Sequence, residues 1–79
     1  MKIHVYYYAA LREARGLTSE TIETNAKTAS ELYTELQNRF PFKLSQDQLR
    51  VAVNNEFCDW STVFKSDDRI VFIPPVAGG

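Results

Sequence analysis

The stretch TASELYTELQNRFP, residues 28–41, decides the fold because it predicts the one long helix of the chain. Thr28 and Glu31 have the spacing of a capping box, in which the threonine hydroxyl accepts from a free amide and the glutamate returns to the cap residue's own amide. Pro41 disfavours helical geometry at the preceding residue and therefore ends the helix. Apolar residues recur at helical spacing along one stripe, at Ala29, Leu32, Tyr33, Leu36 and Phe40. A helix with a single apolar stripe is expected to cover one face of a sheet.

Strand patterns flank this helix on both sides. Residues 2–8 alternate between two faces, with Ile3, Val5 and Tyr7 on one and His4, Tyr6 and Tyr8 on the other. We expect further strands over residues 18–24, 49–53, 56–60 and 69–73, of which 56–60 is a short edge strand. Residues 9–15 predict a short helical turn that stops at Gly16, residues 42–48 predict a polar loop, and Asn54-Asn55 predicts a tight turn. This order of elements indicates the α+β class.

Composition limits the chain to one small domain and excludes several classes of function. The 79 residues are 44% hydrophobic, which is enough for a single core. The formal net charge is -1, so the chain lacks the excess of basic residues that nucleic-acid binding requires. The N-terminal residues have no signal-peptide pattern, and no stretch is apolar enough to span a bilayer. We therefore expect a cytoplasmic protein without a nucleic-acid or membrane partner.

Cys58 and His4 are the only residues of their types in the chain. A single cysteine forms no internal disulfide and no multi-thiolate metal site. A free cysteine is most often a small buried hydrophobe, so we interpret both residues as structural and predict no metal site.

The last six residues, Pro74-Pro75-Val76-Ala77-Gly78-Gly79, predict a tail that leaves a folded domain of residues 1–73. Two prolines stiffen its base and two glycines narrow its tip, and it spans on the order of 20 Å when extended. One reading of such a tail is an incidental terminus. The other is a carboxylate to be activated, because an α-carboxyl with a pKa of about 3.3–3.7 is an unreactive anion until adenylation makes it an electrophile. A sulfur nucleophile or a lysine amine would then displace AMP.

Three segments together carry a more specific signal. The ending Val71-Phe72-Ile73-Pro74-Pro75-Val76-Ala77-Gly78-Gly79, with Val51-Ala52-Val53-Asn54 and Tyr8-Ala9-Ala10-Leu11-Arg12-Glu13, resembles the small subunit of molybdopterin synthase. The resemblance extends over essentially the whole chain. It implies a ubiquitin-like β-grasp fold, with a mixed sheet packed on one main helix. Pro74, Pro75, Val76, Gly78 and Gly79 match the family's motif, and Ala77 stands at a variable position.

The resemblance also implies a function for the terminus. Gly79 would be adenylated by an enzyme resembling those that activate ubiquitin, with ATP used by that enzyme, and a sulfur donor protein would convert it to a thiocarboxylate. The tail, residues 74–79, would then enter the large synthase subunit within a heterotetramer. There it would donate sulfur to the cyclic pyranopterin monophosphate precursor of the molybdopterin dithiolene, one sulfur per tail. On this reading the chain binds no cofactor itself and is not an enzyme alone.

Partner surfaces are predicted from the alternation in the first strand. If Ile3, Val5 and Tyr7 face the helix, Tyr6 and Tyr8 lie on the open face of the sheet, where aromatic rings are unusual unless a partner covers them. We predict an interface formed by Tyr6, Tyr8 and Phe72, with Tyr8 foremost. The alternative is that loops or the ring of Phe72 cover these tyrosines within the monomer.

Three other functions remain open at this point. A carrier of the same fold would serve thiamin synthesis or transfer-RNA thiolation. A ubiquitin-like modifier would become conjugated to lysines through Gly79. A plain interaction domain would be indifferent to loss of Gly79.

Overall fold

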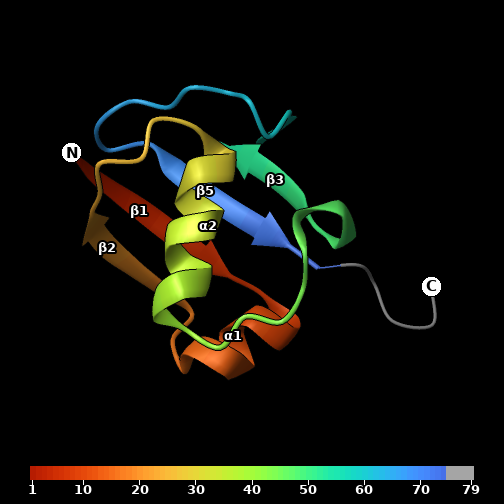
Figure 1. Ribbon diagram of the computed structural model, residues 1–79. Coiled ribbons are helices and arrows are strands. Elements are labelled where there is room, and N and C mark those ends of the chain that lie inside the picture. The colour runs from red at the N-terminus through yellow and green to blue at the C-terminus, as the bar shows by residue number, and fades with distance from the viewer. Residues whose placement is uncertain (75–79) are drawn as a thin grey trace.

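A mixed five-stranded sheet carries the main helix on one face in the computed structural model, which describes residues 1–74 (Figure 1). The elements follow the expected order. They are β1 (Lys2–Tyr7), α1 (Ala9–Arg15), β2 (Ser19–Glu23), α2 (Ala29–Arg39), the 3-10 turn η1 (Gln46–Gln48), β3 (Arg50–Val53), β4 (Glu56–Cys58) and β5 (Arg69–Ile73). Neither helix in this part of the chain is long and apolar enough to cross a membrane.

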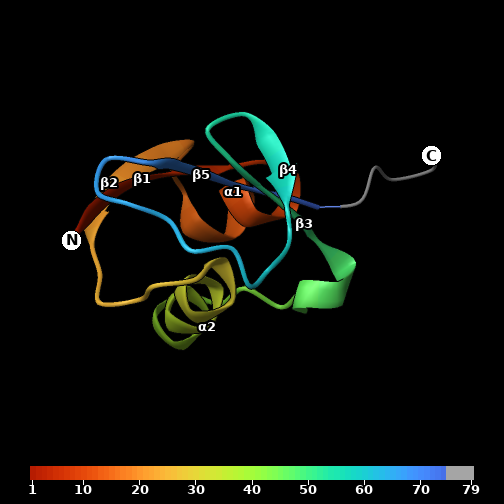
Figure 2. The same cartoon turned by 90° about the horizontal axis from the view of Figure 1, so that it is seen from above.

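The sheet has the order β2-β1-β5-β3-β4, so the first and last strands lie side by side at its centre. β1 runs parallel to β5, with Val5 opposite Ile70 and Tyr7 opposite Phe72, and all other pairs are antiparallel. Figure 2 shows α2 lying across one side of this sheet and leaving the other side uncovered by a helix.

Helix α2 begins and ends where its sequence predicts. The Thr28 side chain accepts a hydrogen bond from the amide of Glu31 at 3.2 Å, and Phe40 caps the other end in an extended conformation. The return bond differs from the expected capping box, because the carboxylate of Glu31 accepts from the amide of Lys27 at 2.8 Å and not from that of Thr28. The carboxylate therefore ties down the chain one residue before the cap.

The core lies between α2 and the sheet. Ala29, Leu32, Tyr33 and Leu36 of α2 are all buried, as the apolar stripe predicts. Their partners on the sheet include fully buried side chains from both central strands, namely Ile3, Val5, Tyr7, Ile70 and Phe72. The segment 42–48 is not wholly polar as expected, because the ring of Phe42 is buried and stacks on that of Tyr33, with 6.1 Å between centroids.

The tight turns use the residues that the sequence singles out. Asn54 and Asn55 both have positive φ, of 52° and 73°, and Gly16 ends α1 with φ of 80°. Asparagine and glycine tolerate this conformation better than other residues do. Asn54 also links two turns, because its side chain donates to Asp68 and accepts from the amide of Arg69.

The cap of α2 gives a direct test. Replacing Thr28 by alanine removes the side-chain acceptor for the amide of Glu31. We expect Thr28→Ala to lower the free energy of unfolding by about 1 kcal/mol. Thr34→Ala makes the same chemical change at an exposed position within the helix, where alanine is the better helix former, and should not lower the free energy of unfolding. Urea unfolding of both variants makes the comparison, and equal losses would contradict the assignment of the cap.

Candidate functional site

The chain reaches its C-terminal segment from the centre of the sheet. β5 lies between β1 and β3, so its last residue, Ile73, is opposite Arg50 at the start of β3 and close to the end of β1. Pro74, which the sequence assigned to the tail, is buried, so the chain is still in contact with the folded body there. The other predicted tail residues lie outside the described part of the chain: Pro75, Val76, Ala77, Gly78 and Gly79.

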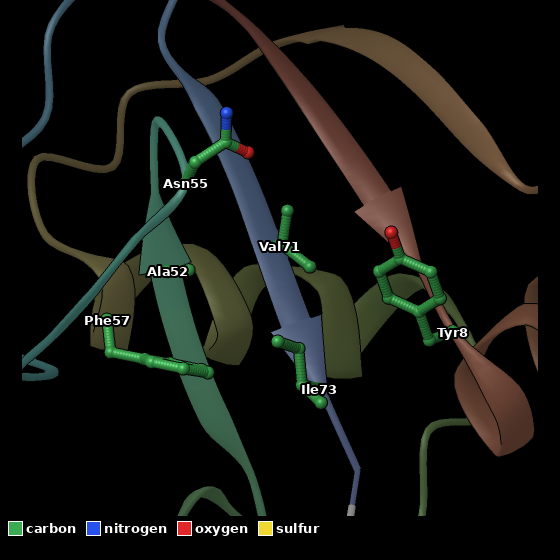
Figure 3. A pocket seen from close by; sticks show the side chains of 6 residues that line it. All are labelled: Tyr8, Ala52, Asn55, Phe57, Val71 and Ile73. Atoms are coloured by element: carbon green, nitrogen blue, oxygen red, sulfur yellow. The ribbon is translucent and has the colours of Figure 1, made fainter.

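A groove on the open face of the sheet extends to Ile73 at the end of β5, and we call it the exit groove (Figure 3). It is lined by Tyr8, Ala52, Asn55, Phe57, Val71 and Ile73. Four of these side chains come from three neighbouring strands, on which alternate residues point to the same face. Tyr8 follows β1, and Asn55 lies in the turn between β3 and β4. A smaller hollow continues it along Tyr6 and Arg69.

Two aromatic side chains of the groove are exposed to solvent. Phe57 is 58% exposed and Tyr8 is 48% exposed. The guanidinium of Arg50 lies over the ring of Phe57, with 4.1 Å from its central carbon to the ring centroid, which adds a cation–π contact at the rim. An apolar floor with exposed aromatic rings and an arginine has the composition of a protein-binding surface.

The structure divides the three predicted interface residues between the two faces of the sheet. Tyr6 and Tyr8 line hollows of the open face, because Ile3, Val5 and Tyr7 face the helix and are fully buried. Phe72 was wrongly predicted for a surface, since it is 0% exposed. It faces α2, with its ring 5.2 Å from that of Tyr33, and Val71 and Ile73 take the outward positions of β5.

The sequence reasoning missed Phe57. It lies on the edge strand β4 opposite Ala52, which puts it on the open face. The available signal was the alternation of Phe57 with Cys58, since Cys58 packs toward the core. That signal is weak in a strand of three residues.

His4 and Cys58 are not brought together. They lie on β1 and β4, which are three strand spacings apart and therefore on the order of 14 Å. Nδ1 of His4 lies 3.0 Å from the hydroxyl of Thr21, and the Cys58 thiol lies 3.8 Å from the carbonyl oxygen of Val51. Within residues 1–74 no three potential metal ligands converge.

A partly buried ionic cluster joins the end of β1, α1 and β2, and we call it the Glu20 anchor. The hydroxyl of Tyr7 donates to Oε2 of Glu20 at 2.7 Å, and Arg15 donates to both carboxylate oxygens, at 2.8 and 2.9 Å. The hydrogen bonds from Arg15 hold the pKa of Glu20 below its usual value. Burial, reinforced by the bond to Glu20, raises the pKa of Tyr7. The cluster is therefore ionised at Glu20 and neutral at Tyr7 near neutral pH.

Comparison with known proteins places this fold in a family. The model of the ThiS family matches residues 5–79, which include the exit groove and the C-terminal glycines. The chain belongs to the ThiS family. Among relatives of comparable length, the molybdopterin synthase sulfur carrier subunit of Mycobacterium tuberculosis is 37% identical, over 100% of this chain and 99% of its own.

Solved structures agree with the expected ubiquitin-like β-grasp fold. SAMP1, the small archaeal modifier protein 1 of Haloferax volcanii, superimposes with a TM-score of 0.81 over 100% of both chains, at 19% identity. A second match is one chain of the complex between subunits 1 and 2 of molybdopterin-converting factor from Helicobacter pylori. It superimposes with a TM-score of 0.71 over 100% of both chains, at 28% identity. The predicted α+β class, with a ubiquitin-like β-grasp fold, is therefore confirmed.

The Glu20 anchor predicts a specific dependence of stability on pH. A carboxylate whose pKa is lower in the folded state contributes stability that is complete above the unfolded-state pKa, about 4.3 for glutamate, and is lost as the pH falls through the folded-state pKa. We therefore expect the stability advantage of the wild type over Glu20→Gln to be largest above about pH 5 and to shrink in acid. Urea unfolding across a pH series measures it. An advantage that does not change with pH would contradict the ionic anchor.

Proposed function

We propose that this chain is the sulfur carrier subunit of a molybdopterin synthase and that the carboxyl group of Gly79 carries the sulfur. The observation that carries the proposal is the match to the Mycobacterium tuberculosis carrier, which covers 100% of this chain and 99% of that protein. A second sulfur carrier subunit, from Homo sapiens, matches at 32% identity over 99% of this chain. The Gly78-Gly79 ending, with no side chain to obstruct an attacking group, is compatible with chemistry at the terminus.

The chemistry divides into activation and sulfur loading. A carboxylate oxygen of Gly79 attacks the α-phosphorus of ATP on an activating enzyme, and pyrophosphate leaves. A sulfur nucleophile at the oxidation level of sulfide then attacks the acyl carbon. AMP leaves with the electron pair of the broken carbon–oxygen bond, and the terminus becomes a thiocarboxylate. Activation is required because the unmodified carboxylate is an anion at neutral pH.

Delivery takes place in the large subunit. The thiocarboxylate sulfur attacks a carbon of the cyclic pyranopterin monophosphate and displaces an oxygen substituent, which leaves with the electron pair of its bond and takes up a proton. Water then attacks the acyl carbon of the resulting thioester, the acyl–sulfur bond breaks with its electron pair on sulfur, and the Gly79 carboxylate is regenerated while the sulfur stays on the pterin. A dithiolene contains two sulfur atoms, so two loaded carriers serve each product. The thiocarboxylate of the carrier is thus consumed in each cycle, and the protein is ready to be activated again.

The exit groove is the proposed docking surface for the large subunit. The groove ends at Ile73, so a partner that receives the following residues also lies next to its aromatic rings. The Helicobacter pylori complex supports this arrangement in general terms, because its two subunits bind each other. Docking would cover Tyr8 and Phe57, the two exposed aromatic side chains of the groove.

Intact-protein mass spectrometry tests the role of Gly79. We expect chain purified from its native host, or treated with activating enzyme, ATP and a sulfur donor, to contain a species heavier by the difference between a sulfur and an oxygen atom. Deletion of Gly79 should abolish this species. Ala77→Gly, a change at a position outside the glycine pair, should retain it.

Two outcomes would contradict the proposal. One is a mass that always equals that of the plain acid when activating enzyme, ATP and sulfur donor are all supplied. The other is a ladder of larger species that depends on ATP and Gly79 and forms without the thiocarboxylate species, because this would indicate conjugation to lysines in place of sulfur transfer.

Affinity for the large subunit tests the groove. Truncating a central aromatic residue of an interface typically costs 1–2 kcal/mol or more, so we expect Tyr8→Ala and Phe57→Ala each to weaken binding on the order of tenfold. Val63→Ala removes an exposed apolar side chain outside the groove and should leave the affinity unchanged. Isothermal titration calorimetry measures all three dissociation constants. Equal affinities for the wild type and both groove variants would remove the exit groove from the interface.

A further inference from the structure

One carboxylate holds both ends of the segment that contains α1. Tyr7 precedes the helix and Arg15 lies in its last turn, yet both donate hydrogen bonds to the side chain of Glu20 on β2. The chain between residues 7 and 20 is thereby closed into a loop whose two ends meet at one group. A charged acceptor with several donors is stronger than neutral hydrogen bonds, and partial burial strengthens it further.

The Glu20 anchor is also attached to the main helix. The guanidinium of Arg15 lies over the ring of Phe40, the residue that caps α2, at 4.1 Å from the centroid. The ring of Tyr7 is buried and contacts that of Phe42, with 5.6 Å between centroids. The loop therefore rests on the rigid core and not on solvent-exposed contacts alone.

Tyr8 lies between the two attachment points and on the opposite face of the sheet. It caps α1 without a side-chain bond, its carbonyl oxygen accepts from the amide of Leu11 at 3.1 Å, and its ring lines the exit groove. The next residue, Ala9, has φ of 49°, a left-handed conformation that a side chain disfavours. Backbone strain of this kind persists only where the surrounding structure holds it.

We propose that the Glu20 anchor positions Tyr8 for docking, so that its ring is already oriented in the exit groove before a partner arrives. Glu20, Arg15 and Tyr7 are positioning residues in this scheme and act only through Tyr8. The inference rests on the proposed role of the groove as the docking surface. Its physical basis is that an ordered side chain loses less conformational freedom on binding, which is worth about twofold to tenfold in affinity.

The first experiment examines the free protein and needs no partner. Glu20→Gln replaces the carboxylate with an amide that cannot accept both bonds from Arg15. We expect the backbone order parameter of Tyr8, from nuclear magnetic resonance relaxation at neutral pH, to fall from about 0.85 toward 0.6. Residues of α2 away from the anchor, such as Leu32, should keep their wild-type values. An unchanged order at Tyr8 would overturn the inference, whatever the function of the groove.

The second experiment is a double-mutant cycle with the large subunit. Glu20→Gln should weaken binding about twofold to tenfold in the wild-type background and have no effect in the Tyr8→Ala background. In the Phe57→Ala background, where Tyr8 is intact, Glu20→Gln should weaken binding as much as it does in the wild type. The same loss of affinity in the Tyr8→Ala background would overturn the inference by showing that the anchor affects binding without acting through Tyr8.

A milder variant covers the case in which Glu20→Gln does not fold. Tyr7→Phe removes only the hydroxyl and leaves the ring in the core and the bond between Arg15 and Glu20 in place. It should produce a smaller change of the same kind in both measurements. Failure of every groove variant to alter affinity would contradict the proposed docking surface, whereas the order of Tyr8 in the free protein decides the anchor separately.

Discussion

The parallel pairing of β1 with β5 is the constraint on which the rest of the structure depends. It brings the first and last strands of the described chain together at the centre of the sheet, beneath the one helix that covers them. Because the two strands run in the same direction, the end of β5 comes out beside the end of β1. The exposed Tyr8 and Ile73, the last residue of β5, therefore line the same groove (Figure 3).

Alternation along these strands separates the side chains of the core from those of the exit groove. On β5, Ile70 and Phe72 face α2 and are fully buried, whereas Val71 and Ile73 form the floor of the exit groove. At the end of β1, Tyr7 enters the core and Tyr8 lies on the open face. Substitutions on the open face can therefore alter the proposed docking surface without creating a cavity in the core.

Sequence patterns predicted the elements well where one pattern dominated, as in α2 and β1, and failed where local pattern was ambiguous. Residues 70–73 are all apolar, so period alone does not say which of them faces the helix, and Phe72 was placed on the wrong side. The single aromatic Phe42 in a polar segment carries no period at all. The Glu20 anchor depends on the β1–β2 register, in which Val5 lies opposite Glu20, and register between strands is a tertiary property.

The central place of β5 also bears on how the protein is made. Without β5, the remaining strands form only two separate pairs, β1 with β2 and β3 with β4. Isolated strand pairs are marginally stable in water, and their unpaired edges favour aggregation. During synthesis on the ribosome the sheet therefore closes only after residues 69–73 have left the exit tunnel. A chain that ends before residue 69 leaves the edges of β1 and β3 unpaired, so folding of the sheet requires the strand that leads into the C-terminal segment.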